Sequence, residues 1–138
     1  MKFFCAVTFL LSLASVAFAR EESILARVTS YWAGEGSNYA STGERLRAGH
    51  CAVDPNRIPY GSKVVFADGV CTAVDTGSAV VNRKAARRCG RTASQLKAIV
   101  VDRFFETKRE AMAWTNAHPE FITLQIVPPG SHQDLTAP

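Results

Sequence analysis

Apolar and polar positions along this chain alternate in short runs, as is typical of β-strands. Each run is rich in β-branched and aromatic residues and is bounded by Gly, Pro, Asn, Asp or Ser. Six strands are predicted, at residues 24–32, 50–54, 63–67, 70–74, 98–104 and 121–127. Between the third and fourth, Asp68-Gly69 is the dipeptide signal for a two-residue hairpin with a type I′ turn.

Helical spacing is rarer along the chain. Residues 106–117 place Ala111, Met112 and Trp114 at helical intervals, and Pro119 ends that pattern. Thr92 or Ser94 could cap a second, shorter helix. We therefore expect a mainly β protein with one or two short inserted helices. A small closed barrel fits best, because closure removes exposed sheet edges.

The two ends of the chain differ from the middle. Residues 1–19 have a basic start, an apolar run and the small-residue ending Ala17-Phe18-Ala19, as in a secretory signal peptide. A membrane-spanning helix is the alternative, but the apolar run is shorter than the roughly 18–20 residues needed. Residues 20–127 form one expected domain, and 128–138 a tail of low hydrophobicity that we expect to be disordered.

The net charge of the chain indicates what kind of molecule it could bind. The leader holds one of the 16 basic residues and no acidic one, so the remaining 119 residues carry 15 basic against 12 acidic residues, a formal +3. Six of the basic residues fall within 83–97, with no acid between Asp75 and Asp102. For an exported protein, which we expect to be a monomer, this predicts an anionic partner such as cell wall or a membrane surface, and no nucleic acid. A solvated surface helix is the alternative for this basic segment. Cys5 lies too early to be a lipoprotein cysteine, so we expect no stable membrane anchor.

Three cysteines remain outside the leader: Cys51, Cys71 and Cys89. In an oxidising compartment an odd number indicates one disulfide and one spare thiol. Cys51 and Cys71 occupy matching places in two predicted strands, which favours that pair. A zinc site is the alternative, but it usually needs four ligands at short spacings, and the three histidines are scattered. We expect no metal and no cofactor.

Three of the predicted strands end on the same carboxylate. Asp54, Asp75 and Asp102 close the runs "CAVDP", "TAVDTG" and "IVVDRFF". Turns favour the first two, because an aspartate can hydrogen-bond the backbone two residues on. Asp102 lies within an apolar run, where burial should raise its pKa. Its structural alternative is a buried ion pair with Arg103 or another arginine.

The combination of motifs resembles the bacterial three-aspartate (3D) domain of cell-wall proteins and of the membrane-bound lytic transglycosylase A family. "STGERLRAGHCAVDPNRIPYGSKVV", "AVDTGSAV" and "VVDRFFETKREAMAW" carry the resemblance, over roughly 90 residues. It implies a six-stranded double-psi β-barrel that gathers the three aspartates at one groove, and peptidoglycan as the substrate. In the transglycosylase branch, the residue matching Asp102 is the catalytic acid/base, and those matching Asp54 and Asp75 support it.

The resemblance also suggests groove residues. Thr42 and Gly43 match a groove position, and Thr76 and Gly77 are expected to hold the sugar. Apart from the resemblance, Tyr31, Trp32 and Tyr39 around the loop that follows the first strand could stack on sugar faces, although aromatic residues in a first strand more often fill the core. Arg103, next to Asp102, is a further candidate for substrate contact. The chain departs from the family at residues 78–82, which read Ser-Ala-Val-Val-Asn where the family has Gly-Ala-Ile-Lys-Gly. The basic segment also lengthens the interval between the last two aspartates.

The sequence thus predicts an exported protein of the periplasm or cell wall that cleaves the β-1,4 bond of peptidoglycan, with Asp102 as acid/base. One acid can suffice, because in a lytic transglycosylase the sugar's own 6-hydroxyl attacks, whereas an ordinary glycosidase needs two carboxylates. A non-catalytic wall-binding module is the second interpretation. A secreted expansin-like or inhibitor protein acting on other polysaccharides is the third.

Overall fold

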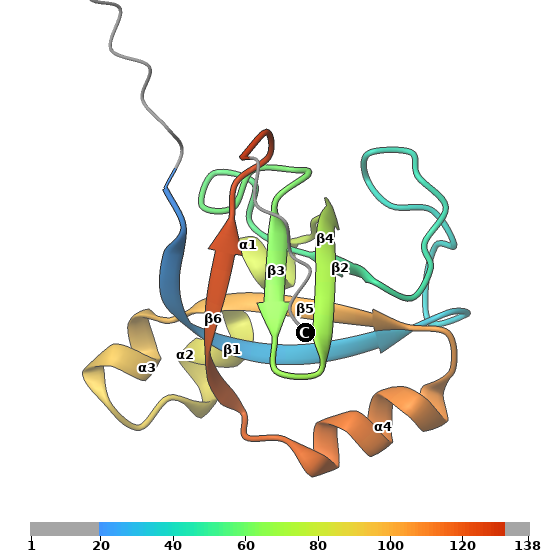
Figure 1. Ribbon diagram of the computed structural model, residues 1–138. Helices are drawn as coiled ribbons and strands as arrows, with labels where there is room; N and C mark the ends of the chain where they lie inside the picture. The colour runs from blue at the N-terminus through green and yellow to red at the C-terminus, as the bar shows by residue number, and fades with distance from the viewer. Residues whose placement is uncertain (1–19, 132–138) are drawn as a thin grey trace, which may run out of the picture.

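The computed structural model describes residues 20–131, in which six strands close a barrel (Figure 1). Neighbouring strands follow the order β1-β5-β2-β4-β3-β6. The strands are β1 (Glu22–Trp32), β2 (His50–Ala52), β3 (Lys63–Phe66), β4 (Gly69–Asp75), β5 (Ile99–Phe105) and β6 (Phe121–Val127). The helices are α1 (Ser78–Val81), α2 (Lys84–Cys89), α3 (Ala93–Lys97) and α4 (Lys108–Ala117).

The barrel mixes parallel and antiparallel pairs. β1 runs parallel to β5 and β2 parallel to β4, while the other four pairings are antiparallel. A parallel pair needs a crossover connection, so a simple up-and-down meander is excluded. The predicted mainly β barrel with short helices is confirmed.

The helices number four in residues 20–131, against the one or two expected. α3 begins where predicted, with the Thr92 hydroxyl accepting a hydrogen bond from the Gln95 N–H. α1 and α2 gave no signal, because Gly77 and Arg83 precede them without any side-chain cap and each is under two turns long. α4 starts with a capping box between Thr107 and Glu110.

The β3–β4 hairpin differs from its prediction in the turn. Phe66 pairs with Gly69, so the two-residue loop is Ala67-Asp68 rather than Asp68-Gly69. A type I′ turn needs positive φ at both central residues. None of these three residues has one, so the predicted turn type is wrong. The Asp68 carboxylate instead accepts hydrogen bonds from Arg103 and Trp114, which anchors the hairpin end to β5 and α4.

The barrel interior is apolar and fully closed to solvent at its centre. Val64, Val101 and Leu124 are each 0 % exposed and come from three different strands. Trp114 of α4 joins the same cluster, so α4 covers one side of the barrel against β1 and β5 (Figure 1). A second cluster joins α1 and α2 to the outer face of β5 through Val80, Ala86 and Val100.

The basic segment folds as helices α2 and α3, which both pack against β1, while α2 also contacts β5. One of its cations is used internally, because Arg83 Nη1 donates to the Leu96 carbonyl over 3.0 Å. The other five are exposed and form what we call the basic surface: Lys84, Arg87, Arg88, Arg91 and Lys97.

The expected Cys51–Cys71 disulfide is not formed. Cys51 and Cys71 are buried and Cys89 is partly buried, and all three are free thiols. The β2–β4 register pairs Cys51 with Ala73, two residues from Cys71. Such diagonal positions lie roughly 7–8 Å apart, beyond the usual Cα separation of a disulfide.

Two predictions concern the ends of the chain. The predicted signal peptide at residues 1–19 lies outside the described residues, and so does the part of the predicted tail from residue 132 onward. Residues 128–131, which we assigned to a disordered tail, form a turn in which the Ser131 hydroxyl donates to the Pro128 carbonyl. Between residues 20 and 131, no helix is long and apolar enough to cross a membrane.

Candidate active site

Strands β4 and β5 bring two of the three aspartates to one cleft. Ala52 of β2 pairs with Asp75 on one side and with Asp102 on the other. The two aspartates are therefore two strand spacings apart, or roughly 10 Å between backbones. Both line a cleft of about 510 Å³. Its other lining residues come from β1, the 35–46 loop and the start of α1: Thr29, Ser30, Tyr31, Glu35, Gly36, Ser37, Tyr39, Leu46, Thr76 and Ala79.

Three donors fix the Asp75 carboxylate. Its Oδ1 accepts from the backbone N–H groups of Ser41 at 2.8 Å and Thr76 at 2.9 Å. Its Oδ2 accepts from the Tyr31 hydroxyl at 3.0 Å. Burial, and then the charge of Asp75, raise the pKa of Tyr31, so the phenol keeps its proton and remains a donor. Asp75 is thus held in place from two loops and a strand.

Asp102 has one donor and a very different environment. The in-register pairing of β1 and β5 sets Thr29 opposite it, and the Thr29 hydroxyl donates to Oδ1 over 3.0 Å. Burial raises the pKa of Asp102 to about 7, and the negative charges of Glu35 and Asp75 act in the same direction. The hydrogen bond from Thr29 opposes these effects without cancelling them. Near neutral pH, Asp102 can therefore both release and accept a proton.

Asp54 takes the turn role instead of joining the cleft. It is not among the cleft-lining residues. Its Oδ1 accepts from the Asn56 N–H at 3.0 Å, and its carbonyl accepts from the N–H groups of Arg57 and Ile58. This is the aspartate turn that the sequence left open as an alternative. The expected groove with three carboxylates contains Asp75 and Asp102, joined by Glu35.

Arg103 faces away from the cleft, because neighbouring residues of a strand point to opposite faces. Its Nη1 binds Asp68 Oδ1 at 2.8 Å. Its guanidinium lies over the rings of Phe66 and Trp114, at 4.6 and 5.0 Å from their centroids. Neither of its expected roles, as partner of Asp102 or as substrate contact in the cleft, fits this position.

The remaining sugar-binding candidates divide into two groups. Tyr31 and Thr76 line the cleft, and the buried Thr76 Oγ1 has no hydrogen-bond partner among the described residues. Thr42, Gly43 and Gly77 do not line it. Thr42 donates to the Val74 carbonyl at 2.8 Å, Gly43 makes a turn at φ +90°, and Gly77 precedes α1. These three support the loops around the cleft.

Sequence reasoning missed several cleft residues. Thr29 could have been found only from the parallel β1–β5 register, which the chain order does not reveal. Glu35 lies in the loop at residues 33–49, whose length indicated a functional segment without singling out this residue. Tyr39, a stacking candidate from the sequence, lines the cleft and is 57 % exposed.

Histidine and metal chemistry have no evident place in this cleft. His50 is buried, its Nε2 lies 3.5 Å from Glu44 Oε2, and burial lowers its pKa. Within residues 20–131 there is no group of three or more potential metal ligands. Comparison with known proteins adds no assignment, because no protein-family model and no curated protein matches the sequence.

Proposed function

We propose that this protein is an exported enzyme of the three-aspartate family that cleaves β-1,4 glycosidic bonds of peptidoglycan by a lytic transglycosylase-like route. The observation that carries the proposal is the asymmetry of two carboxyl groups in one cleft. Asp75 is held by three donors, whereas Asp102 has one donor and a pKa raised to about 7 by burial. A general acid needs a pKa near the working pH.

The reaction follows from this asymmetry. Asp102 donates its proton to the glycosidic oxygen as the bond from that oxygen to the anomeric carbon breaks. The negative charges of Asp75 and Glu35 favour the positive charge that develops on the sugar ring. The sugar's 6-hydroxyl then attacks the anomeric carbon and returns its proton to Asp102. The products are a 1,6-anhydro sugar end and a free 4-hydroxyl, with no water consumed.

Two further groups in the cleft suit a sugar. The exposed Tyr39 ring offers an apolar face for stacking. The buried Thr76 Oγ1 has no partner within residues 20–131, so a rotation of this side chain toward the cleft would let it bond a sugar hydroxyl without breaking a protein contact. Both lie on the same cleft as Asp102, so a bound sugar would be placed within reach of the acid.

The test is product analysis on purified sacculi. The wild-type protein should release anhydromuropeptides detectable by mass spectrometry, and Asp102→Asn should release fewer by roughly 10²–10⁴-fold. Asp54→Asn is the matched control, because asparagine keeps the turn-forming oxygen and Asp54 lies outside the cleft. Equal release by the Asp102 variant, or loss confined to the Asp54 variant, would refute the assigned roles.

A wall-binding module without catalysis is the second candidate, favoured by the departure at residues 78–82. In this chain the segment begins α1, and Ser78, next to the cleft-lining Ala79, stands where the family has a glycine. A side chain at such a place limits how closely a sugar can approach the backbone. Retention of the protein on sacculi without any soluble product would favour this function.

A further inference from the structure

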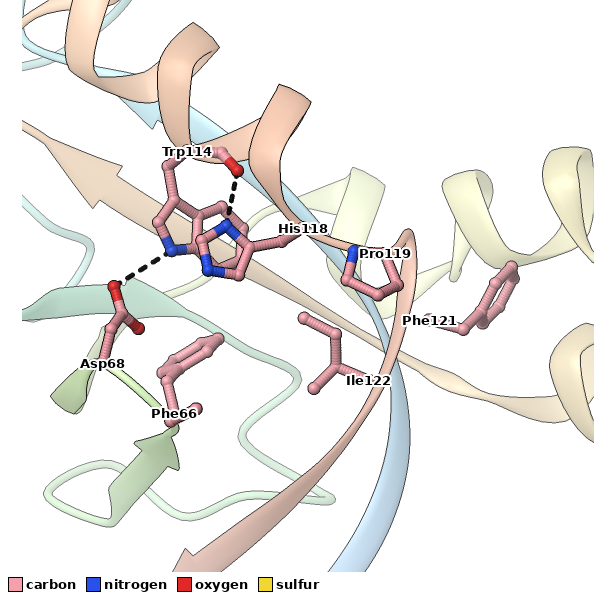
Figure 2. Close-up of a pocket in the computed structure, with 8 residues that line it drawn as sticks. Phe66, Asp68, Trp114, His118, Pro119, Phe121 and Ile122 are labelled. Carbon is pink, nitrogen blue, oxygen red and sulfur yellow. Dashed lines mark hydrogen bonds between the residues drawn. The ribbon is translucent and has the colours of Figure 1, made fainter.

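A second cavity lies away from the carboxylate cleft, under the C-terminal end of α4. It measures about 200 Å³ and is bounded by the β3–β4 hairpin, the end of α4 and the start of β6 (Figure 2). The two cavities have no lining residue in common. Its lining consists of Phe66, Ala67, Asp68, Trp114, His118, Pro119, Phe121 and Ile122.

Most of this lining is apolar, and its one acid is already neutralised. Asp68 binds Arg103 at 2.8 Å and Trp114 Nε1 at 3.1 Å. Burial alone would raise its pKa, but the hydrogen bond and charge of Arg103 lower it, so the pair stays ionised and satisfied. A charged ligand would therefore find no free countercharge here, which favours a neutral one.

The aromatic wall is held in place before any ligand arrives. His118 stacks on Trp114 with ring centroids 4.3 Å apart and an interplanar angle of 18° (Figure 2). Phe66 meets the same indole edge-on at 5.8 Å. Sugars bind aromatic residues through open ring faces, and the Trp114 ring is already packed by Phe66, Arg103 and His118. A compact apolar ring suits this cavity better than a sugar.

One polar atom at the cavity, His118 Nε2, is a hydrogen-bond acceptor that residues 20–131 leave free. His118 Nδ1 lies 2.7 Å from the Trp114 carbonyl oxygen, and since a carbonyl only accepts, Nδ1 carries the proton. In the neutral imidazole the other nitrogen, Nε2, is then an acceptor. No hydrogen bond from the described residues occupies it.

We propose that this cavity is a binding site for a small neutral aromatic molecule carrying one O–H or N–H donor, of the phenol or indole class. The ring occupies the space between Phe66, His118 and Ile122, and the donor bonds His118 Nε2 (Figure 2). The size agrees, since an apolar cavity of about 150 Å³ is enough to hold benzene. Occupation would join the hairpin, α4 and β6, and so would stabilise the fold by ligand linkage.

Phenol and toluene are the matched probes, because they have the same shape and differ in the donor. Titration of the full chain with phenol should shift the Trp114 Nε1–H resonance saturably and raise the unfolding temperature. In His118→Phe, which keeps an aromatic ring on Trp114, the ratio of phenol to toluene affinity should fall about fivefold or more, the size of one neutral hydrogen bond.

Two variants make the outcome decisive. Ala67→Leu, at an exposed position that lines the cavity, should fill the space and abolish the phenol shift while the protein stays folded. Asp102→Asn should bind phenol as the wild type does, because it lies in the other cleft. No saturable shift with 10 mM phenol, an equal shift in Ala67→Leu, or an unchanged affinity ratio in His118→Phe would overturn the proposal.

Discussion

At the scale of single residues, the surroundings of Asp102 decide what the cleft can do. In the proposed mechanism Asp102 must carry its proton to act as the general acid, so with a pKa of about 7 the activity should fall as the pH rises above about 7. Glu35 contributes to this pKa through its negative charge. Glu35→Gln should therefore move the alkaline limb of the pH–activity profile to lower pH. A limb that stays in place would exclude Glu35 as a contributor.

The same group links folding stability to pH. Asp102 has a higher pKa in the folded protein than the usual 3.8, so the folded state binds its proton more tightly than the unfolded state does. Its contribution to stability is fully present below about pH 4 and is lost as the pH rises to about 7. At pH 8, Asp102→Asn should be more stable than the wild type by roughly 2–4 kcal/mol.

Denaturant titrations at pH 4 and pH 8 measure this effect. The gain from Asp102→Asn should shrink strongly at pH 4, where the carboxyl is protonated in the folded state and nearly half protonated in the unfolded state. Asp54→Asn is the control, because Asp54 lies outside the cleft and asparagine keeps its turn-forming oxygen. Equal gains at both pH values would show that the effect is one of packing rather than of ionisation.

The sequence alone could identify Asp54, Asp75 and Asp102 as candidates, but it could not show that Asp54 lies outside the cleft. All three follow the same kind of apolar run, and only the register of β2 against β4 and β5 shows which of them share a cleft. Arg103 was misjudged for a related reason. Its neighbour in sequence is Asp102, but strand alternation sends the two side chains to opposite faces.

At the scale of elements, the contact between α2 and α3 depends on Gly90. A Cβ built there would lie 2.7 Å from the Ala86 carbonyl oxygen and 2.8 Å from the Leu96 nitrogen, both of them backbone atoms. Gly90→Ala should therefore lower the free energy of unfolding by roughly 1–3 kcal/mol, the usual cost of overpacking. Gly36→Ala, with no atom within 4 Å, should change it little.

Denaturant midpoints of the two variants provide the measurement. The comparison isolates the steric cost, because neither glycine has a positive φ and alanine fits both backbones. A Gly90 variant as stable as the Gly36 variant would mean that α2 and α3 move apart without loss.

Element by element, the strands and the capped helices were predictable. β6 (Phe121–Val127) agrees with the sequence at both ends, and Thr92 and Thr107 begin α3 and α4 through their hydroxyl groups. α1 and α2 were missed because short helices without caps are stabilised by tertiary packing, here Val80 and Ala86 against β5. The hairpin turn was misplaced by one residue, because the Asp68 carboxylate is engaged with Arg103 and Trp114.

At the scale of the whole molecule, the basic surface predicts how the protein meets its substrate. Its five exposed cations have no ion-pair partner among the described residues. Binding to anionic sacculi should therefore weaken as salt is raised, because screening shortens the reach of exposed charges to about 10 Å at 0.1 M. Replacing Lys84, Arg87, Arg88, Arg91 and Lys97 by glutamine should flatten that salt dependence.

Arg45→Gln with Arg57→Gln is the control for this prediction, because both are exposed cations outside the basic surface. Co-sedimentation with sacculi at 20 and 300 mM salt measures the effect. If the variant with all five substitutions loses sacculus binding with salt as steeply as the wild type does, the cations of the basic surface have a purely structural role.

The pairing of Ala52 with both aspartates also bears on how the protein responds to heat. Ala52 of β2 pairs with Asp75 of β4 on one side and with Asp102 of β5 on the other. The distance between the two aspartates is therefore set by main-chain pairing within a closed barrel, and no hinge separates them. Asp75 and Asp102 cannot move apart on warming while β2 stays paired with β4 and β5. The proposed activity should therefore be lost on heating at the same temperature as the far-ultraviolet circular dichroism signal. There should be no temperature range in which the protein is folded but inactive.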